Sequence, residues 1–121
     1  MLIALSLVAF ALVQAQAPPA EPELPVLKAN LGGCSAEFTV KDADGAPVYN
    51  ALVHVRVRYG ALNLKRMDLE VGTNGAGKAR IAGLPDKARP MTYDITKDTR
   101  KVTVDQDLAK TCDGRFEVTL K

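Results

Sequence analysis

The most constraining feature of this sequence is the stretch ALVHVRVRY, from Ala51 to Tyr59. Successive side chains of a β-strand point to opposite faces of a sheet, so apolar residues at every second position indicate a strand with one buried face. The apolar set here consists of Ala51, Val53, Val55, Val57 and Tyr59. The outward set consists of Leu52, His54, Arg56 and Arg58. The stretch therefore predicts a half-buried strand.

The rest of the chain repeats this design in shorter segments. RMDLEV, at 66–71, would place Met67, Leu69 and Val71 inward. The remaining predicted strands are Phe38–Val40, Lys78–Ile81, Met91–Ile95, Lys101–Val104 and Arg115–Leu120. Turn-forming sequences separate them, namely DADGAP, YGALN, TNGAG, LPDKARP and CDG. About seven short strands without a helical period predict an all-β fold, a single antiparallel β-sandwich.

The N-terminus indicates export. Residues 2–13 form an uninterrupted apolar and small-residue run, followed by QAQAPPA. The run has the length of a signal-peptide core and is shorter than the roughly 20 apolar residues of a membrane span, although Lys and Arg are absent before it. Cleavage is favoured after Ala15 over Ala17, because Pro18 would directly follow the second site. We predict a signal peptide at 1–15 and a periplasmic or extracellular protein with no transmembrane segment.

The remaining sequence divides into a linker and one domain. Residues 16–33 are rich in Pro, Ala and Glu and show almost no apolar pattern, so we expect an extended linker there. Residues 34–121 are then the β-sandwich domain. The net charge of +2 is too small and too evenly spread to indicate nucleic acid or an anionic membrane as a partner.

Two cysteines, Cys34 and Cys112, lie near the two ends of the predicted domain. In an exported chain an even number of cysteines favours a disulfide, which here would close a long loop and stabilise the fold by roughly 4 kcal/mol. Cys34 shares the parity of Phe38 and Val40, and Cys112 shares that of Phe116 and Val118, so parity turns both toward the interior unless the turn at Gly114 breaks the second register. LGGC, at 31–34, resembles a lipobox, but charged residues and prolines separate it from the apolar run, which disfavours lipid modification.

The stretch GTNGAGKA, at 72–79, approaches the phosphate-binding motif GxxxxGK[ST]. Ala79 stands where the motif needs a hydroxyl to bind magnesium, and the residues after Lys78 alternate as in a strand rather than starting a helix. Asn74 and Gly75 together are instead a strong hairpin signal, because both tolerate positive φ. We therefore interpret the stretch as a turn, and Lys78 as a solvated residue.

The sequence FTVKDADGAPVYNALVHV, followed by TNGAGKARIAGLP and YDI, resembles the carboxypeptidase regulatory-like domain and its transthyretin-like relatives among Ig-like bacterial modules. In that family a strand runs into a DxxGxPV turn, an A-x-V-x-V strand follows, and a T-x-x-x-G turn precedes a strand ending near Leu-Pro. The resemblance covers residues 34–104 and implies an Ig-like (transthyretin-like) sandwich. It implies that the first turn is shaped by Asp42, Gly45, Pro47 and Val48. It implies little about function, because such folds serve many roles.

Catalytic and metal-binding variants of related folds fit this sequence poorly. Transthyretin-like hydroxyisourate hydrolases use His and Arg residues and a C-terminal Tyr-Arg-Gly-Ser, whereas this chain ends EVTLK and has a single histidine. Collagen-adhesin domains can form a Lys to Asn isopeptide bond, but the last predicted strand has no asparagine. DADG, at 42–45, resembles the start of an EF-hand loop, but Val53 occupies the twelfth position. We predict no catalytic residue, no metal and no cofactor.

The candidate binding face comprises His54, Arg56, Arg58 and Tyr59, because basic and aromatic groups together are common in recognition surfaces; the alternative is a solvated sheet face with no partner. Arg56 and Arg58 are expected to face Asp68 and Glu70 on the neighbouring strand. The predicted function is an exported, non-catalytic interaction or structural module whose partner is a protein or cell-envelope component. The alternatives are a transthyretin-like hydrolase and a calcium or small-ligand carrier.

Overall fold

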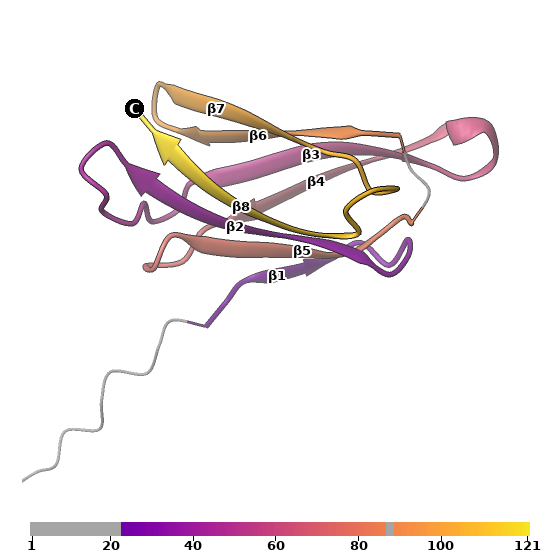
Figure 1. Cartoon of the computed structure of the whole chain (residues 1–121), viewed down its shortest axis with the longest axis horizontal. Helices are drawn as coiled ribbons and strands as arrows, with labels where there is room; N and C mark the ends of the chain where they lie inside the picture. The colour runs from indigo at the N-terminus through magenta and orange to yellow at the C-terminus, as the bar shows by residue number, and fades with distance from the viewer. Residues whose placement is uncertain (1–22, 87–88) are drawn as a thin grey trace, which may run out of the picture.

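The computed structural model describes residues 23–86 and 89–121, so the predicted signal peptide lies outside the described residues. The described chain forms two four-stranded sheets that lie face to face (Figure 1). The strands are β1 (Val26–Lys28), β2 (Cys34–Asp42), β3 (Leu52–Tyr59), β4 (Lys65–Gly72), β5 (Lys78–Leu84), β6 (Met91–Lys97), β7 (Arg100–Gln106) and β8 (Asp113–Leu120). A short 3-10 turn, η1 (Ala61–Asn63), connects β3 to β4. The predicted all-β sandwich is confirmed.

The first sheet has the strand order β1-β5-β2-β8 and the second has the order β4-β3-β6-β7. All pairs in the second sheet are antiparallel. In the first sheet β2 and β5 are antiparallel, whereas β1 pairs with β5 and β8 pairs with β2 in parallel. The sequence predicted an antiparallel sandwich, so these two parallel pairs were missed. Pairing direction depends on which distant segments of the chain meet, and local sequence does not show this.

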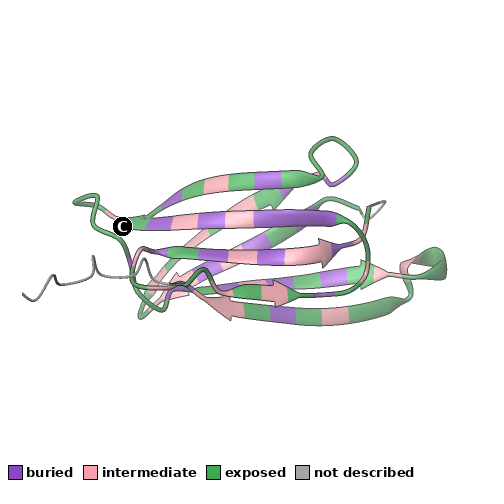
Figure 2. Ribbon diagram, turned by 90° about the horizontal axis from the view of Figure 1, so that it is seen from below, coloured by how far each residue is buried: buried purple, intermediate pink, exposed green. Residues whose placement is uncertain are grey.

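The predicted inward residues fill the space between the sheets. Val53, Val55 and Val57 on β3 are at most 1% exposed, and buried and exposed residues alternate along the strands (Figure 2). On β3 Tyr59 is the exception, since it lies at the end of the strand and is only half-buried. Met67 and Val71 on β4 are also only half-buried. The alternation of β3 is thus the main sequence signal that places its charged residues on the outer face of the second sheet.

An aromatic cluster joins the two sheets at the centre of the core. The ring centroids of Phe38 and Tyr93 are 4.8 Å apart, and those of Phe38 and Phe116 are 5.4 Å apart. The buried Tyr93 hydroxyl donates a hydrogen bond to Gln106 Oε1 at 2.6 Å, and the Gln106 amide donates to the carbonyls of Ser35 and Thr111. Burial raises the pKa of Tyr93 well above its ordinary value, so the phenol stays protonated and continues to donate.

The Cys34–Cys112 disulfide predicted from the sequence is present. Cys34 begins β2 and Cys112 immediately precedes β8, and the parallel register sets the next residues, Ser35 and Asp113, opposite each other. Ser35 N–H donates to the Cys112 carbonyl at 2.8 Å. The expectation that both cysteines face inward is wrong for Cys112, which is exposed because β8 begins only at the following residue.

The strand β1 lies inside the range 16–33, for which the sequence predicts a linker. Its three residues pair with β5 in register from Val26 opposite Arg80 to Lys28 opposite Ala82. Residues 26–28 therefore belong to the fold, contrary to the prediction of an extended linker outside it. The strand was missed because three residues between Pro25 and Ala29 are too short to show an alternating pattern.

The stretch TNGAG is a turn, as predicted, but not a hairpin turn. It connects β4 in the second sheet with β5 in the first, so it crosses between the layers. Positive φ occurs at Gly77, with φ 74°, and not at Asn74 or Gly75. A Cβ atom at Gly77 would collide with the carbonyl oxygen of Val40. Close packing of the backbone therefore accounts for the glycine at this position, and a phosphate-binding role is not needed to explain it. A strand follows directly at the exposed Lys78, as expected.

The predicted turn at 42–45 is also confirmed. One carboxylate oxygen of Asp42 accepts hydrogen bonds from the backbone N–H groups of Asp44 and Ala46, each at 2.9 Å. Gly45 has φ 83° and donates its N–H to the Asp42 carbonyl at 3.0 Å. The Asp42 carboxylate therefore stabilises the turn by accepting backbone hydrogen bonds within it.

Candidate functional site

The outer face of the second sheet carries an open hollow of about 490 Å³. Three of the four predicted binding residues line it from β3, and β6 with the preceding residues supplies the other side. Its lining residues are His54, Arg56, Arg58, Arg89, Pro90, Met91, Thr92 and Asp94. We call this feature the arginine groove. Its composition follows from the alternation of β3, which turns His54, Arg56 and Arg58 to the same side.

Asp68 on β4 neutralises part of the charge next to the arginine groove. Its Oδ1 atom accepts a hydrogen bond from Arg56 Nε at 3.1 Å and lies 3.3 Å from His54 Nε2. The hydrogen bond from Arg56 holds the pKa of Asp68 below its ordinary value, and the charges of Arg56 and His54 add to this effect. The predicted pairing of Arg56 with Asp68 is thereby confirmed.

The second predicted pair does not form, because Arg58 faces Arg66 instead of Glu70. In an antiparallel register the residue numbers of one strand rise as those of its partner fall. Once Arg56 is opposite Asp68, Arg58 must be opposite Arg66, and Glu70 is opposite His54. Like charges directly opposite each other on a sheet are unfavourable unless they remain solvated. The register therefore concentrates positive charge at the end of β3.

Two arginines of the groove have no carboxylate partner among residues 23–86 and 89–121. These are Arg58 and Arg89, both of which are exposed. The acidic residue of the groove, Asp94, lies 3.8 Å from Lys101 Nζ on β7. The Thr92 hydroxyl donates to Asp105 Oδ1 at 2.6 Å. Two guanidinium groups therefore remain available to an external anion.

Tyr59 lies outside the arginine groove, in a neighbouring hollow of about 460 Å³. This second hollow is lined by Leu31, Arg58, Tyr59, Gly60, Asn63, Pro85 and Asp86. Arg58 lines both hollows. The structure therefore places three of the four predicted residues in the arginine groove and Tyr59 in a second hollow that shares only Arg58 with it.

Sequence reasoning missed Arg89, the second free guanidinium of the groove. It lies in the LPDKARP segment, which was interpreted only as a turn. Its position depends on β6 pairing with β3, which sets Tyr93 opposite Val55 and brings the residues before β6 toward Arg58. Basic residues in a turn beside a predicted strand were the available signal, but the neighbour of that strand was unknown.

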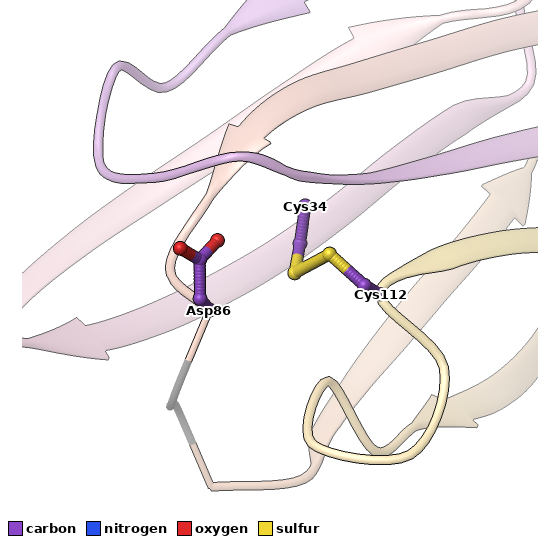
Figure 3. A group of neighbouring side chains, drawn as sticks. All are labelled: Cys34, Asp86 and Cys112. Atoms are coloured by element: carbon purple, nitrogen blue, oxygen red, sulfur yellow. A yellow bond between two sulfur atoms is a disulfide. The ribbon is translucent and has the colours of Figure 1, made fainter.

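Possible metal ligands gather at one place in the described residues, where Cys34, Asp86 and Cys112 lie close together (Figure 3). The two sulfur atoms are bonded to each other, so neither can act as a thiolate ligand. Asp86 Oδ1 accepts a hydrogen bond from Gly33 N–H at 2.7 Å. This cluster is best described as a disulfide beside a loop-fixing carboxylate.

Comparison with known proteins supports the fold but assigns the chain to no family. No family model matches the chain, and no curated protein matches it. Among solved structures, catechol 1,2-dioxygenase from Acinetobacter sp. ADP1, inhibited by bound mercury, is 15% identical with a TM-score of 0.52. The alignment covers 82% of this chain and 59% of that one.

A second similar structure is catechol 1,2-dioxygenase from Pseudomonas arvilla C-1, which is 12% identical with a TM-score of 0.54. Here the alignment covers 81% of this chain and 58% of the other. This chain thus spans less than two thirds of either enzyme. Similarity at this level of identity shows a shared β-sandwich architecture and nothing about activity.

The part of the chain that the structure describes contains no helix long and apolar enough to cross a membrane.

Proposed function

We propose that this protein is an exported, non-catalytic binding module whose arginine groove holds a carboxylate-bearing partner, such as an acidic segment of a protein or of a cell-envelope polymer. The observation that carries the proposal is the pair of exposed guanidinium groups, Arg58 and Arg89, which line one hollow without a carboxylate partner among the described residues. Guanidinium forks match carboxylates in geometry and can form two parallel hydrogen bonds with each.

The surroundings of the groove favour binding over catalysis. His54 is the only histidine of the chain and lies beside Asp68, and the Thr92 hydroxyl is engaged by Asp105. The groove is open to solvent along a sheet face, whereas acid–base and nucleophilic catalysis rely on groups whose pKa values burial and neighbours have tuned. A carboxylate polymer lying across the sheet would contact Arg58 and Arg89 with little rearrangement.

Export is supported by the disulfide and by the N-terminal sequence. Disulfides form and persist in oxidising compartments, and the apolar residues 2–13 have the length of a signal-peptide core. Outside the cytoplasm, acidic envelope polymers and secreted proteins would both offer suitable carboxylates. The similarity to two enzymes of 12% and 15% identity concerns the fold alone. The proposal therefore rests on the groove, the disulfide and the N-terminal sequence.

The test uses poly-L-glutamate as a carboxylate probe and the Arg58→Ala/Arg89→Ala double variant. Loss of two charge-assisted contacts should weaken binding at least tenfold at low salt, measured by microscale thermophoresis. Added salt should weaken the binding of the unmodified protein, because the contacts are solvent-exposed.

The matched control removes an exposed arginine from the opposite sheet. Arg115 lies on β8 in the first sheet, and Arg115→Ala should leave the affinity within about twofold of the unmodified protein. An equal loss of binding free energy per removed charge in the double variant and the control would mean that the polymer senses net charge alone, and the proposed groove would be rejected.

A further inference from the structure

The hairpin formed by β3 and β4 ends in an apolar tip. Figure 1 shows this hairpin, with η1 at its end, extending beyond the remaining strands at one end of the sandwich. Leu62 is 88% exposed and Leu64 is 77% exposed, the two highest values among the large exposed hydrophobic residues. Two leucines so close together, held away from the core at a projecting end, indicate a contact outside the chain.

The backbone at the tip adds a second unusual feature. Leu62 has φ 58° and ψ 19°, in the left-handed region that glycine and asparagine tolerate better than leucine. Burial within the domain does not offset this cost, since the Leu62 side chain is almost fully exposed. The conformation displays an apolar side chain at the outermost turn, which is consistent with a role in binding.

Positive charge lies directly behind the two leucines. Lys65 and Arg66 are exposed at the start of β4, and Arg66 faces Arg58 across the hairpin. The sequence contains no acidic residue between Asp44 and Asp68, so positive charge is concentrated in this hairpin, contrary to the even spread that disfavoured an anionic membrane as a partner. Tyr59 pairs with Lys65, so an aromatic ring also lies at the level of the cations.

We propose that this tip inserts into the surface of an anionic lipid membrane, which goes beyond the carboxylate binding of the arginine groove. Strands rise about 3.3 Å per residue, so Lys65 and Arg66 lie at the depth of the phosphates when Leu62 and Leu64 enter the acyl region. Tyr59 then lies in the headgroup layer, where aromatic residues are enriched.

A membrane fits this tip better than a protein partner does. A stable protein interface buries roughly 800 Å² on each partner, usually with a shaped surface. The tip is a narrow turn with two leucines, and a fluid bilayer can receive it without a complementary pocket. Lys and Arg near an anionic leaflet also strengthen binding in a way that requires no specific geometry.

The absence of tryptophan from the sequence allows a site-specific test. Leu64→Trp places a single indole at the tip, and Tyr49→Trp places one at an exposed position before β3, at the opposite end of that strand. Vesicles of phosphatidylglycerol and phosphatidylcholine should shift the emission of the Leu64→Trp protein to shorter wavelength. They should leave the emission of the Tyr49→Trp protein unchanged.

Vesicle sedimentation then tests the side chains that carry the contact. Leu62→Ser/Leu64→Ser should lower partitioning at least tenfold, and each cation removed in Lys65→Gln/Arg66→Gln should lower it about fivefold. Tyr49→Ser serves as the matched control, because it removes another exposed hydrophobic residue, 68% exposed, and it should bind as the unmodified protein does. All variants should keep the unmodified circular dichroism spectrum, since the altered side chains are exposed.

Three results would overturn the proposal. An unshifted emission of the Leu64→Trp protein with anionic vesicles would show that the tip stays in water. Equal partitioning of Leu62→Ser/Leu64→Ser and the unmodified protein would place any lipid contact elsewhere, including the apolar residues 2–13 if these are retained. Self-association that the leucine variant abolishes, without vesicle binding, would assign the tip to a contact between copies of the chain.

Discussion

At the scale of single residues, Asp68 determines which cations on the outer face of the second sheet have a carboxylate partner. Its carboxylate meets both Arg56 and His54, which leaves Arg58, further along the same face of β3, without a partner among the described residues. The difference between Arg56 and Arg58 therefore comes from register, because both side chains point outward from the same strand. Exposed pairs of this kind contribute little to stability, and here the pair mainly decides which cation remains available.

The pKa of Asp68 provides a direct check of this arrangement. It should lie below 3.8, and Arg56→Ala should raise it toward that value because the hydrogen bond from Arg56 is the largest cause of the shift. His54→Ala should have a smaller effect. Carboxyl carbon NMR across a pH titration measures all three proteins, and a pKa of Asp68 that does not respond to Arg56→Ala would contradict the contact.

The same shift predicts a pH dependence of stability. A carboxylate whose pKa is lower in the folded state stabilises the fold at pH values above its unfolded pKa. That contribution is lost as the pH falls below about 3.8 and through the lowered folded value. The stability difference between the unmodified protein and Asp68→Asn, measured by urea denaturation at a series of pH values, should therefore shrink on acidification.

At the scale of elements, the parallel pairing of β2 and β8 explains the position of the disulfide. The pairing sets Ser35 opposite Asp113, and their side chains form a hydrogen bond of 2.7 Å from Ser35 Oγ to Asp113 Oδ1. Each cysteine immediately precedes one of these two residues in the chain, Cys34 within β2 and Cys112 just before β8. The bond therefore ties two neighbouring strands that are 78 residues apart in the chain.

Cys112→Ala should lower the free energy of unfolding by about 4 kcal/mol, the value expected for a loop of this length in the chain-entropy model. Cys34→Ala should cost somewhat more, because Cys34 is 1% exposed and its removal also leaves a small cavity. The double variant should match Cys34→Ala alone, since the bond can be lost only once. Urea denaturation followed by circular dichroism measures the series, and additive losses would argue against a shared bond.

The elements also show what local sequence can and cannot predict. The alternation of apolar and polar residues located β3 and β4 and predicted which of their side chains face the core, because a strand with one buried face carries an apolar residue at every second position. It could not find β1, whose three residues carry no period, nor the crossover at TNGAG, where Gly77 rather than Asn74 takes positive φ. The pairing of β1 and the crossover at TNGAG both depend on which distant strands pack beside them, and local sequence does not specify this.

At the scale of the whole molecule, the site was predictable only in part. His54, Arg56 and Arg58 could be placed on one outward face from β3 alone. Arg89 enters the arginine groove only because β6 pairs with β3, a contact between segments far apart in the chain. Leu62 was likewise predicted only as part of a turn and Leu64 was assigned no role, since exposure of an apolar residue cannot be inferred from its identity.

The molecule as a whole presents two surfaces with different chemistry. The arginine groove offers guanidinium groups on a sheet face, and the hairpin tip offers leucines at one end of the sandwich (Figure 1). Arg58 lies between them, since it lines both hollows and faces Arg66 on the hairpin. A protein bound to a membrane through its tip would hold the groove close to that surface.

Amide chemical-shift mapping tests most directly whether the arginine groove binds carboxylates. Poly-L-glutamate added to the isotope-labelled protein should shift the resonances of Arg58, Arg89 and Thr92, while those of β8 in the first sheet stay in place. Shifts spread evenly over both sheets, or confined to the first sheet, would contradict the claim.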